Sequence, residues 1–290
     1  MKHLFIHSIP VLLRKMLQFV LFTSVFSSLC ALTLCMSTEK LILGKVPALF
    51  SPFHLFIVGC TLVVYNVHYL IKKSTPELSD QYAWVQKNQR FNYFFLLAGV
   101  LLCALFVWQL PKPVIVACIV LSVISFSYSL PVLPFRNKHR LKDFGWLKLL
   151  LLTIVWTTVT AVLPILFWGF DPLAFPFEIL VRFVFLLILC LAFDIRDHQV
   201  DLESGIVTLP NKIGVSNTYM LINVLTCVFV LAGIFQFCRF GTLFRLFDII
   251  FVSFTTMISI YYVKKFPSDK NYIFLVDGQM ILLGLLTIFF

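Results

Sequence analysis

The sequence predicts an all-α, polytopic membrane protein in which residues 1–290 form one transmembrane domain of nine helices. Its composition is the first reason: 60% of the 290 residues are hydrophobic and 12% are charged, whereas a soluble domain has about 45–50% apolar and roughly 25% charged residues. The second reason is that the apolar residues gather into stretches long enough to cross a bilayer. This composition excludes an ordinary soluble enzyme, a disordered chain and a nucleic-acid-binding domain. The net charge of +10 does not alter that, because the basic residues lie in short runs between apolar stretches.

Nine stretches qualify as membrane spans, since each has about 20 mostly apolar residues and could cross ~30 Å of hydrocarbon. In chain order we expect spans at residues 15–36, 50–71, 92–110, 113–130, 147–168, 175–195, 217–238, 244–263 and 271–290. The first stretch is too long for a signal peptide and lacks a small-residue cleavage site followed by a polar chain. The remaining residues form short loops, so no separate soluble domain fits.

The basic residues predict how the chain is oriented. Most Lys and Arg residues fall in alternate loops, beginning with the N-terminal segment and the loop after the second span. Such loops face the cytoplasm. We therefore expect a cytoplasmic N-terminus and, after nine spans, a C-terminus outside, in the cell inner membrane.

Acidic residues are scarce, and a group of them follows the sixth span. Asp194, Asp197, Asp201 and Glu203 lie within ten positions. At 100° per residue, the three aspartates share a sector about 60° wide on one helix face. Like charges at the edge of a bilayer repel and are costly to desolvate unless a cation lies among them. Carboxylate oxygens suit Mg²⁺. A solvated acidic helix end is the alternative.

The residues after the aspartates extend the pattern into a recognisable motif. Asp194-x-x-Asp197-x-x-x-Asp201 is followed by Gly205-x-x-Thr-Leu-Pro and by Gly214. This segment, 191–214, resembles the second aspartate-rich motif of the UbiA-type membrane prenyltransferase superfamily. The resemblance implies nine helices around a central cavity. It also implies an active-site cap built from cytoplasmic loops at about 72–91, 131–146 and 196–216.

The resemblance also implies a reaction. Such enzymes bind an allylic prenyl diphosphate through Mg²⁺ and transfer the prenyl group to an apolar acceptor, often an aromatic or quinone-like ring. Asp194, Asp197 and Asp201 would then be the catalytic, metal-binding residues. Metal and basic groups neutralise the departing diphosphate. A cavity inside the helical bundle, lined with aromatic side chains and surrounded by membrane lipid, keeps a carbocation from water. The implied partners are the prenyl diphosphate and its acceptor, with no nucleic acid.

The family's first aspartate motif is degenerate in this chain. Asn66 is present at the end of the second span, but Val67, Leu70 and Ser74 occupy the positions where the family has aspartates. Such a loss raises the question of whether the chain is active. We hypothesise that Lys73 supplies a diphosphate with part of the positive charge that a metal would have brought. The alternative is that Lys73 only sets the topology.

The loop after the fourth span offers further cations for a diphosphate. Family members have a Tyr at this helix end, followed by basic residues, and the resemblance is partial because Val132 replaces the usual Lys. The candidate diphosphate-binding residues are therefore Asn66, Lys73, Tyr128, Arg136, Arg140 and Lys142. Arg suits such a role, since a guanidinium can contact phosphate through two hydrogen bonds. A basic loop that only sets the topology is the alternative.

The sequence leaves more than one function open. The first is a working, Mg²⁺-dependent membrane prenyltransferase. The second is a catalytically impaired relative that binds an isoprenoid or another lipid, or supports a partner protein. A transporter is less well supported, because transporters often carry internal repeats and broken helices at the bilayer midplane, and this sequence has no evident repeat.

Overall fold

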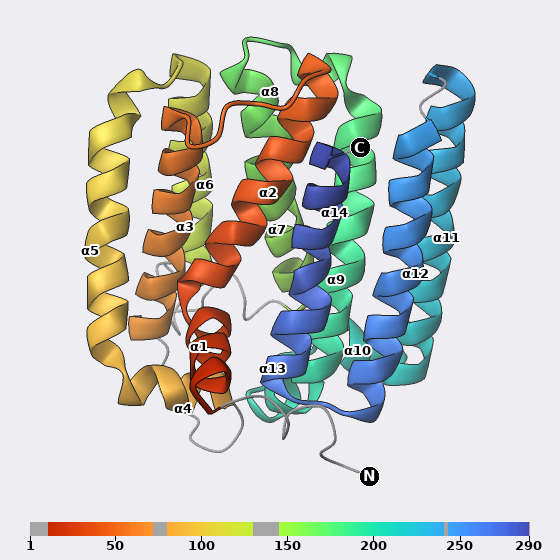
Figure 1. Ribbon diagram of the computed structural model, residues 1–290. Coiled ribbons are helices and arrows are strands. Elements are labelled where there is room, and N and C mark those ends of the chain that lie inside the picture. The colour runs from red at the N-terminus through yellow and green to blue at the C-terminus, as the bar shows by residue number, and fades with distance from the viewer. Residues whose placement is uncertain (1–10, 72–79, 130–144, 241–242, 290) are drawn as a thin grey trace.

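The computed structural model describes residues 11–71, 80–129, 145–240 and 243–289, and these are almost entirely helical (Figure 1). In the first half the elements are α1 (Val11–Phe22), α2 (Ser24–Leu43), α3 (Pro52–Ile71), α4 (Asp80–Lys87), α5 (Gln89–Phe106), η1 (Val107–Gln109) and α6 (Lys112–Ser129). In the second half they are α7 (Gly145–Thr157), η3 (Thr158–Val162), α8 (Leu163–Phe167), η4 (Pro172–Ala174), α9 (Pro176–Glu203), α10 (Leu209–Ile213), α11 (Val215–Phe240), α12 (Leu243–Lys265), α13 (Asp269–Asn271), η5 (Tyr272–Asp277) and α14 (Gly278–Phe289).

The described residues contain eight helices that are long and apolar enough to cross a membrane, and Lys112–Ser127 is a shorter apolar ninth. The all-helical, nine-span prediction is therefore confirmed. Two of the spans contain a π-helical turn: α7, η3 and α8 form one continuous span, as do α13, η5 and α14.

Large apolar side chains remain exposed along the outer helices, as a lipid-facing surface requires. Examples are Leu97 and Leu101 of α5, Val224 and Leu231 of α11, and Phe254 of α12. These features define a multi-pass integral membrane protein.

The first span differs from its prediction. The apolar run at 15–36 breaks at Thr23, where the backbone is extended, and the span itself is α2, which continues to Leu43. The extension of this span to Leu43 was not predicted, because the charged residues Glu39 and Lys40 indicate the start of a loop. In the structure Glu39 is fully buried and accepts hydrogen bonds from His54 and Trp168, so a carboxylate is satisfied within the bundle.

The spans pack into a closed ring. Following contacts from neighbour to neighbour, α2 packs on α3, α3 on α6, α6 on α7, α7 on α9, α9 on α11, α11 on α12, α12 on α14, and α14 again on α2, while α5 lies outside α3. α3 and α5 approach closely because Gly59 and Gly99 face each other. A Cβ on Gly99 would lie 2.8 Å from the Gly59 carbonyl oxygen. A second close approach joins Gly284 of α14 to Thr33 of α2, which helps to close the ring.

The ring has two polar ends, and the short helices α4, α10 and α13 gather at one of them, the lower end in Figure 1. We call it the acidic end, because α9 finishes there with Asp194, Asp197 and Asp201. At the opposite end lie the buried Glu39 and His54, together with Arg245, which pairs with Glu178 at 2.7 Å. Glu39 is 15 residues from Ser24, the first residue of α2, which is about 22 Å along the helix axis.

Candidate active site

The acidic stripe is defined as Asp194, Asp197 and Asp201 on the last turns of α9. The helix runs without a break to Glu203, so the spacing places the three carboxylates on neighbouring turns, as the sequence predicts. The segment from 196 to 203 is thus helical, and the loop begins only at Ser204. The side chains of Asp194 and Asp201 are largely buried, whereas that of Asp197 is 35% exposed. The stripe begins at the buried Asp194 and ends on the last turn of α9, at the acidic end.

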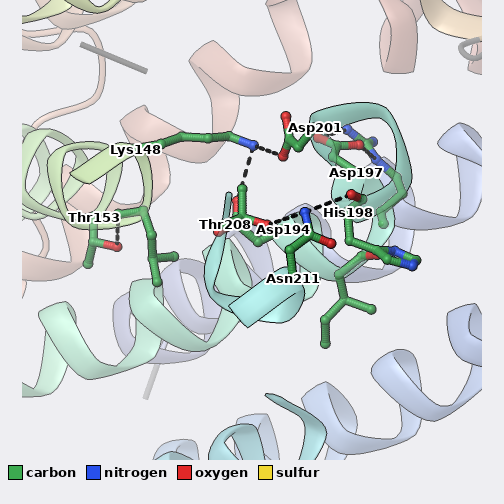
Figure 2. Close-up of polar contacts among 11 residues, drawn as sticks. Lys148, Thr153, Asp194, Asp197, His198, Asp201, Thr208 and Asn211 are labelled. Atoms are coloured by element: carbon green, nitrogen blue, oxygen red, sulfur yellow. Dashed lines mark hydrogen bonds and ion pairs between the residues drawn. The ribbon is translucent and has the colours of Figure 1, made fainter. Parts of the chain in front are cut away.

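Lys148 of α7 lies between two of these carboxylates (Figure 2). Its Nζ is 3.2 Å from Asp194 Oδ1 and 2.6 Å from Asp201 Oδ2. The Lys148 side chain is 12% exposed, and the two carboxylates are similarly enclosed at 5% and 13%. Three largely buried charges therefore share one small region, where attraction is screened less than at an open surface.

Asp197 has a different cation. Arg196 Nε donates to Asp197 Oδ1 at 2.7 Å and Arg196 Nη2 donates to Oδ2 at 3.1 Å. The same guanidinium lies 3.7 Å from a carboxylate oxygen of Asp269 in α13. It also lies over the rings of Phe193 and Tyr272, at 4.7 and 5.6 Å from their centroids. Arg196 is thus fixed by charge and by ring stacking together.

The turn after α9 supports the stripe. Gly205 has a positive φ of 75°, which a glycine adopts without strain, and the Ile206 N–H donates to the Asp201 carbonyl at 2.8 Å. Asn211 of α10 then donates to the His198 carbonyl oxygen and to Thr208 Oγ1, as Figure 2 shows in part. The Gly-x-x-Thr-Leu-Pro motif therefore folds α10 back against the last turns of α9.

The same turn also holds α7. A Cβ on Gly145, the first residue of α7, would lie 1.8 Å from the Val207 carbonyl oxygen, so only glycine allows this backbone contact. α7 thus begins directly against the segment that follows the stripe, and Lys148 is three residues further on. This contact positions the lysine for its two carboxylates.

The end of α3 carries Asn66, the remnant of the first motif, and Tyr69, and each makes polar contacts. Asn66 of α3 is fully buried, and its Nδ2 donates to Ser24 Oγ at 2.6 Å and to the Leu62 carbonyl at 2.7 Å. Three residues on, the Tyr69 hydroxyl accepts from Gln81 Nε2 at 2.8 Å.

Gln81 continues this connection toward the stripe. Its backbone N–H donates to Asp269 Oδ2 at 3.0 Å, and Asp269 contacts Arg196, the partner of Asp197. A chain of polar contacts therefore joins the end of α3 to the end of α9 through α4 and α13.

The other predicted diphosphate ligands cannot be placed. Lys73, Arg136, Arg140 and Lys142, and the side chain of Tyr128, lie outside the described residues. Sequence reasoning missed Lys148, Gln81 and Asp269. Lys148 is 46 and 53 residues from its two carboxylates in the chain, so no local pattern connects them. The sequence does contain one signal for Lys148. This lysine lies in the first turn of a strongly apolar span, at the same end of the bundle as the acidic motif.

The carboxylate oxygens of the stripe are suitable ligands for a divalent cation, but they do not form a complete metal site. Carboxylate oxygens are the ligands that Mg²⁺ prefers. Asp194 Oδ2 is buried and has no hydrogen-bond partner among the described residues, which leaves one such oxygen open. Within the same part of the chain, however, no group of three or more His, Cys, Asp or Glu residues is arranged to hold a metal ion.

Two aromatic side chains on separate spans contact each other. Tyr65 of α3 and Trp156 of α7 meet edge to face, with ring centroids 6.4 Å apart, and both keep part of their surface accessible. Asp277, at the end of the π-helical turn η5, lies close enough to Arg196 for their charges to attract. π-helical turns are frequent at functional sites. Asp277 thus adds a further carboxylate near Arg196, the partner of Asp197.

The fold is that of UbiA-type prenyltransferases. A UbiA homolog from Archaeoglobus fulgidus matches with a TM-score of 0.60 over 94% of this chain and 100% of its own, at 12% sequence identity. Its structure bound to GPP and Mg²⁺ matches with a TM-score of 0.56 (13% identity, 94% and 100% coverage). The structure bound to DMAPP and Mg²⁺ matches at 0.57 (11% identity, 93% and 99% coverage). No protein-family profile and no curated protein matches the sequence.

Proposed function

We propose that this protein is a membrane prenyltransferase that binds a prenyl diphosphate and Mg²⁺ at the acidic end and transfers the prenyl group to an apolar, aromatic or quinone-like acceptor. One observation carries the proposal. Asp194, Asp197 and Asp201 form an ordered stripe at one end of a closed ring of apolar helices. This ring has the fold of a protein whose solved structures hold GPP or DMAPP with Mg²⁺.

In this proposal the two parts of the substrate occupy two regions. The diphosphate would lie at the acidic end, where Asp194, Asp197 and Asp201 would hold the cation. The bound cation would neutralise the charge that develops on the leaving diphosphate. The apolar tail enters the ring of helices, where Tyr65 and Trp156 offer ring faces that stabilise a carbocation and exclude water.

The remaining candidates extend this proposal. Asn66 is proposed on the diphosphate side, where its buried Oδ1, an acceptor with no hydrogen-bond partner among the described residues, would face the cation and not the phosphate oxygens. The other proposed diphosphate ligands are Lys73, Tyr128, Arg136, Arg140 and Lys142. The proposed orientation has the acidic end and the N-terminus in the cytoplasm and the C-terminus outside the inner membrane.

The test uses the purified full chain in detergent with labelled DMAPP or GPP, Mg²⁺ and a panel of quinone-like and phenolic acceptors. Wild-type protein is expected to form a labelled apolar product, and Asp194→Asn is expected to lower its rate at least about 100-fold. Glu203→Gln is the matched control, since Glu203 is an exposed carboxylate on the same helix, and it should stay within about twofold. Absence of product from every acceptor would refute the enzymatic proposal.

A second candidate function is a catalytically impaired relative that binds an isoprenoid or supports a partner protein. It is favoured by the first-motif stretch, where the amide of Asn66 is used for contacts within the protein. This candidate predicts saturable, Mg²⁺-dependent binding of the labelled diphosphate without turnover, and loss of that binding in Asp194→Asn. Binding and turnover measured on the same preparation separate the two functions.

A further inference from the structure

Lys148 has no role in the proposed function, yet it lies within the acidic stripe. Its ammonium contacts one oxygen of Asp194 and one of Asp201, at 3.2 and 2.6 Å. Both carboxylates are largely buried, so each needs a positive charge nearby. A lysine ammonium is a compact cation with three donors, and here it bridges two acidic side chains as a bound cation would.

Lys148 is held in this position by the backbone. α7 begins at Gly145, whose Cα lies so close to the Val207 carbonyl that a Cβ there would be 1.8 Å from the oxygen. Val207 belongs to the turn that directly follows α9, so the start of α7 and the stripe form one packed unit. The lysine is therefore part of the architecture of the acidic end, and its charge is present whether or not a ligand is bound.

This fixed charge affects any divalent cation that approaches the stripe. A metal ion on the Asp194 and Asp201 oxygens would have to displace the ammonium or accept a like charge a few ångströms away. The one carboxylate oxygen of the pair that is buried without a hydrogen-bond partner is Asp194 Oδ2. Mg²⁺ in proteins is commonly held by one or two carboxylates together with substrate phosphates, and this stripe offers a metal only that incomplete ligand set.

We propose that Lys148 is the resident counter-ion of the acidic stripe. It holds Asp194 and Asp201 together in the ligand-free protein, keeps the intrinsic affinity for a divalent cation low, and so makes uptake of the metal depend on the arrival of a diphosphate. The coupling to a diphosphate rests on the proposed function, whereas the counter-ion role does not. Lys148 is a positioning residue in this scheme, because it acts through the carboxylates.

The test is a titration of purified protein with Mn²⁺ alone, followed by the electron paramagnetic resonance signal of the free ion. Lys148→Met is expected to raise the affinity for Mn²⁺ at least about tenfold over wild type, because it removes a like charge from the site. Lys148→Arg keeps the charge and should resemble wild type. Lys212→Met removes an exposed lysine at the same end and should also resemble wild type, and adding Asp194→Asn to Lys148→Met should abolish the gain.

Thermal unfolding supplies a second readout that a purely structural lysine would not produce. Lys148→Met should unfold at a lower temperature than wild type in metal-free buffer and recover when Mn²⁺ alone is added. Wild type should gain stability mainly when Mn²⁺ and inorganic pyrophosphate are present together. Equal Mn²⁺ affinity in wild type and Lys148→Met would overturn the proposal. This result is independent of prenyl transfer, so failure of the enzymatic assay and failure of the counter-ion role can be told apart.

Discussion

Truncation of Glu39 to alanine tests whether the buried polar cluster at the opposite end stabilises the ring. The Glu39 carboxylate accepts from His54 Nε2 at 2.7 Å and from Trp168 Nε1 at 3.1 Å. His54 Nδ1 accepts from the Ser51 N–H, so Nε2 carries the hydrogen. This one side chain therefore links α2 to α3 and to the turn after α8.

The magnitude follows from the burial of the two donors. His54 is 1% exposed, and leaving its N–H without an acceptor costs about 1–3 kcal/mol. Trp168 is 42% exposed, so its indole N–H can bond to water and its lost hydrogen bond costs about 1 kcal/mol. Glu39→Ala should therefore lower the free energy of unfolding by about 2–4 kcal/mol. Glu39→Gln retains one acceptor oxygen and should lose less.

The assay is reversible unfolding in mixed micelles, with Mn²⁺ binding measured on the same samples. Because Glu39 lies at the opposite end of the ring from the stripe, about 22 Å along α2 from Ser24, its loss should leave Mn²⁺ affinity unchanged within about twofold. A loss of stability below about 1 kcal/mol would contradict the reasoning, since a satisfied, fully enclosed carboxylate would then contribute little. A large change in metal affinity would show that the two ends are coupled.

Two further changes test single contacts by the same unfolding measurement. Arg196→Lys removes the two-point contact with Asp197 and should cost about 1 kcal/mol, because an ammonium cannot reproduce two parallel hydrogen bonds; an unchanged stability would show that the pair is dispensable. Gly99→Leu places side-chain atoms where a Cβ is already 2.8 Å from the Gly59 carbonyl and should cost about 1–3 kcal/mol by forcing α3 and α5 apart. Gly278→Ala, where a Cβ meets nothing within 4 Å, is its control and should be neutral or slightly stabilising.

The nine spans and the acidic stripe could be predicted because both depend on local periodicity. Apolar length identifies a span, and helical spacing places Asp194, Asp197 and Asp201 on one face. The first span was placed too early because Glu39 reads as a loop residue unless its partner His54 is known. Such long-range satisfaction of a buried charge is invisible in the sequence. The Lys148 bridge was missed for the same physical reason.

The degenerate first motif has a structural consequence that the stripe alone does not suggest. Where carboxylates on α3 would require a cation to face those on α9, this chain joins the two helices through neutral and oppositely charged groups. Tyr69 is linked to Gln81, Gln81 to Asp269, and Asp269 to Arg196. This contact chain links the end of α3 to the end of α9 through α4 and α13.

The two cationic partners complete this arrangement on the α9 side. Lys148 bridges Asp194 and Asp201, and Arg196 holds Asp197. Each carboxylate of the stripe thus has a partner supplied by the protein itself, which offsets the like-charge repulsion that three aspartates on one helix face would otherwise suffer. In the ligand-free protein the acidic end is therefore expected to keep its fold in a chelating buffer, with unfolding near the temperature seen in Mg²⁺. A drop of more than about 5 °C on chelation, worth roughly 2 kcal/mol for a chain of this size, would show instead that a bound metal holds the stripe together.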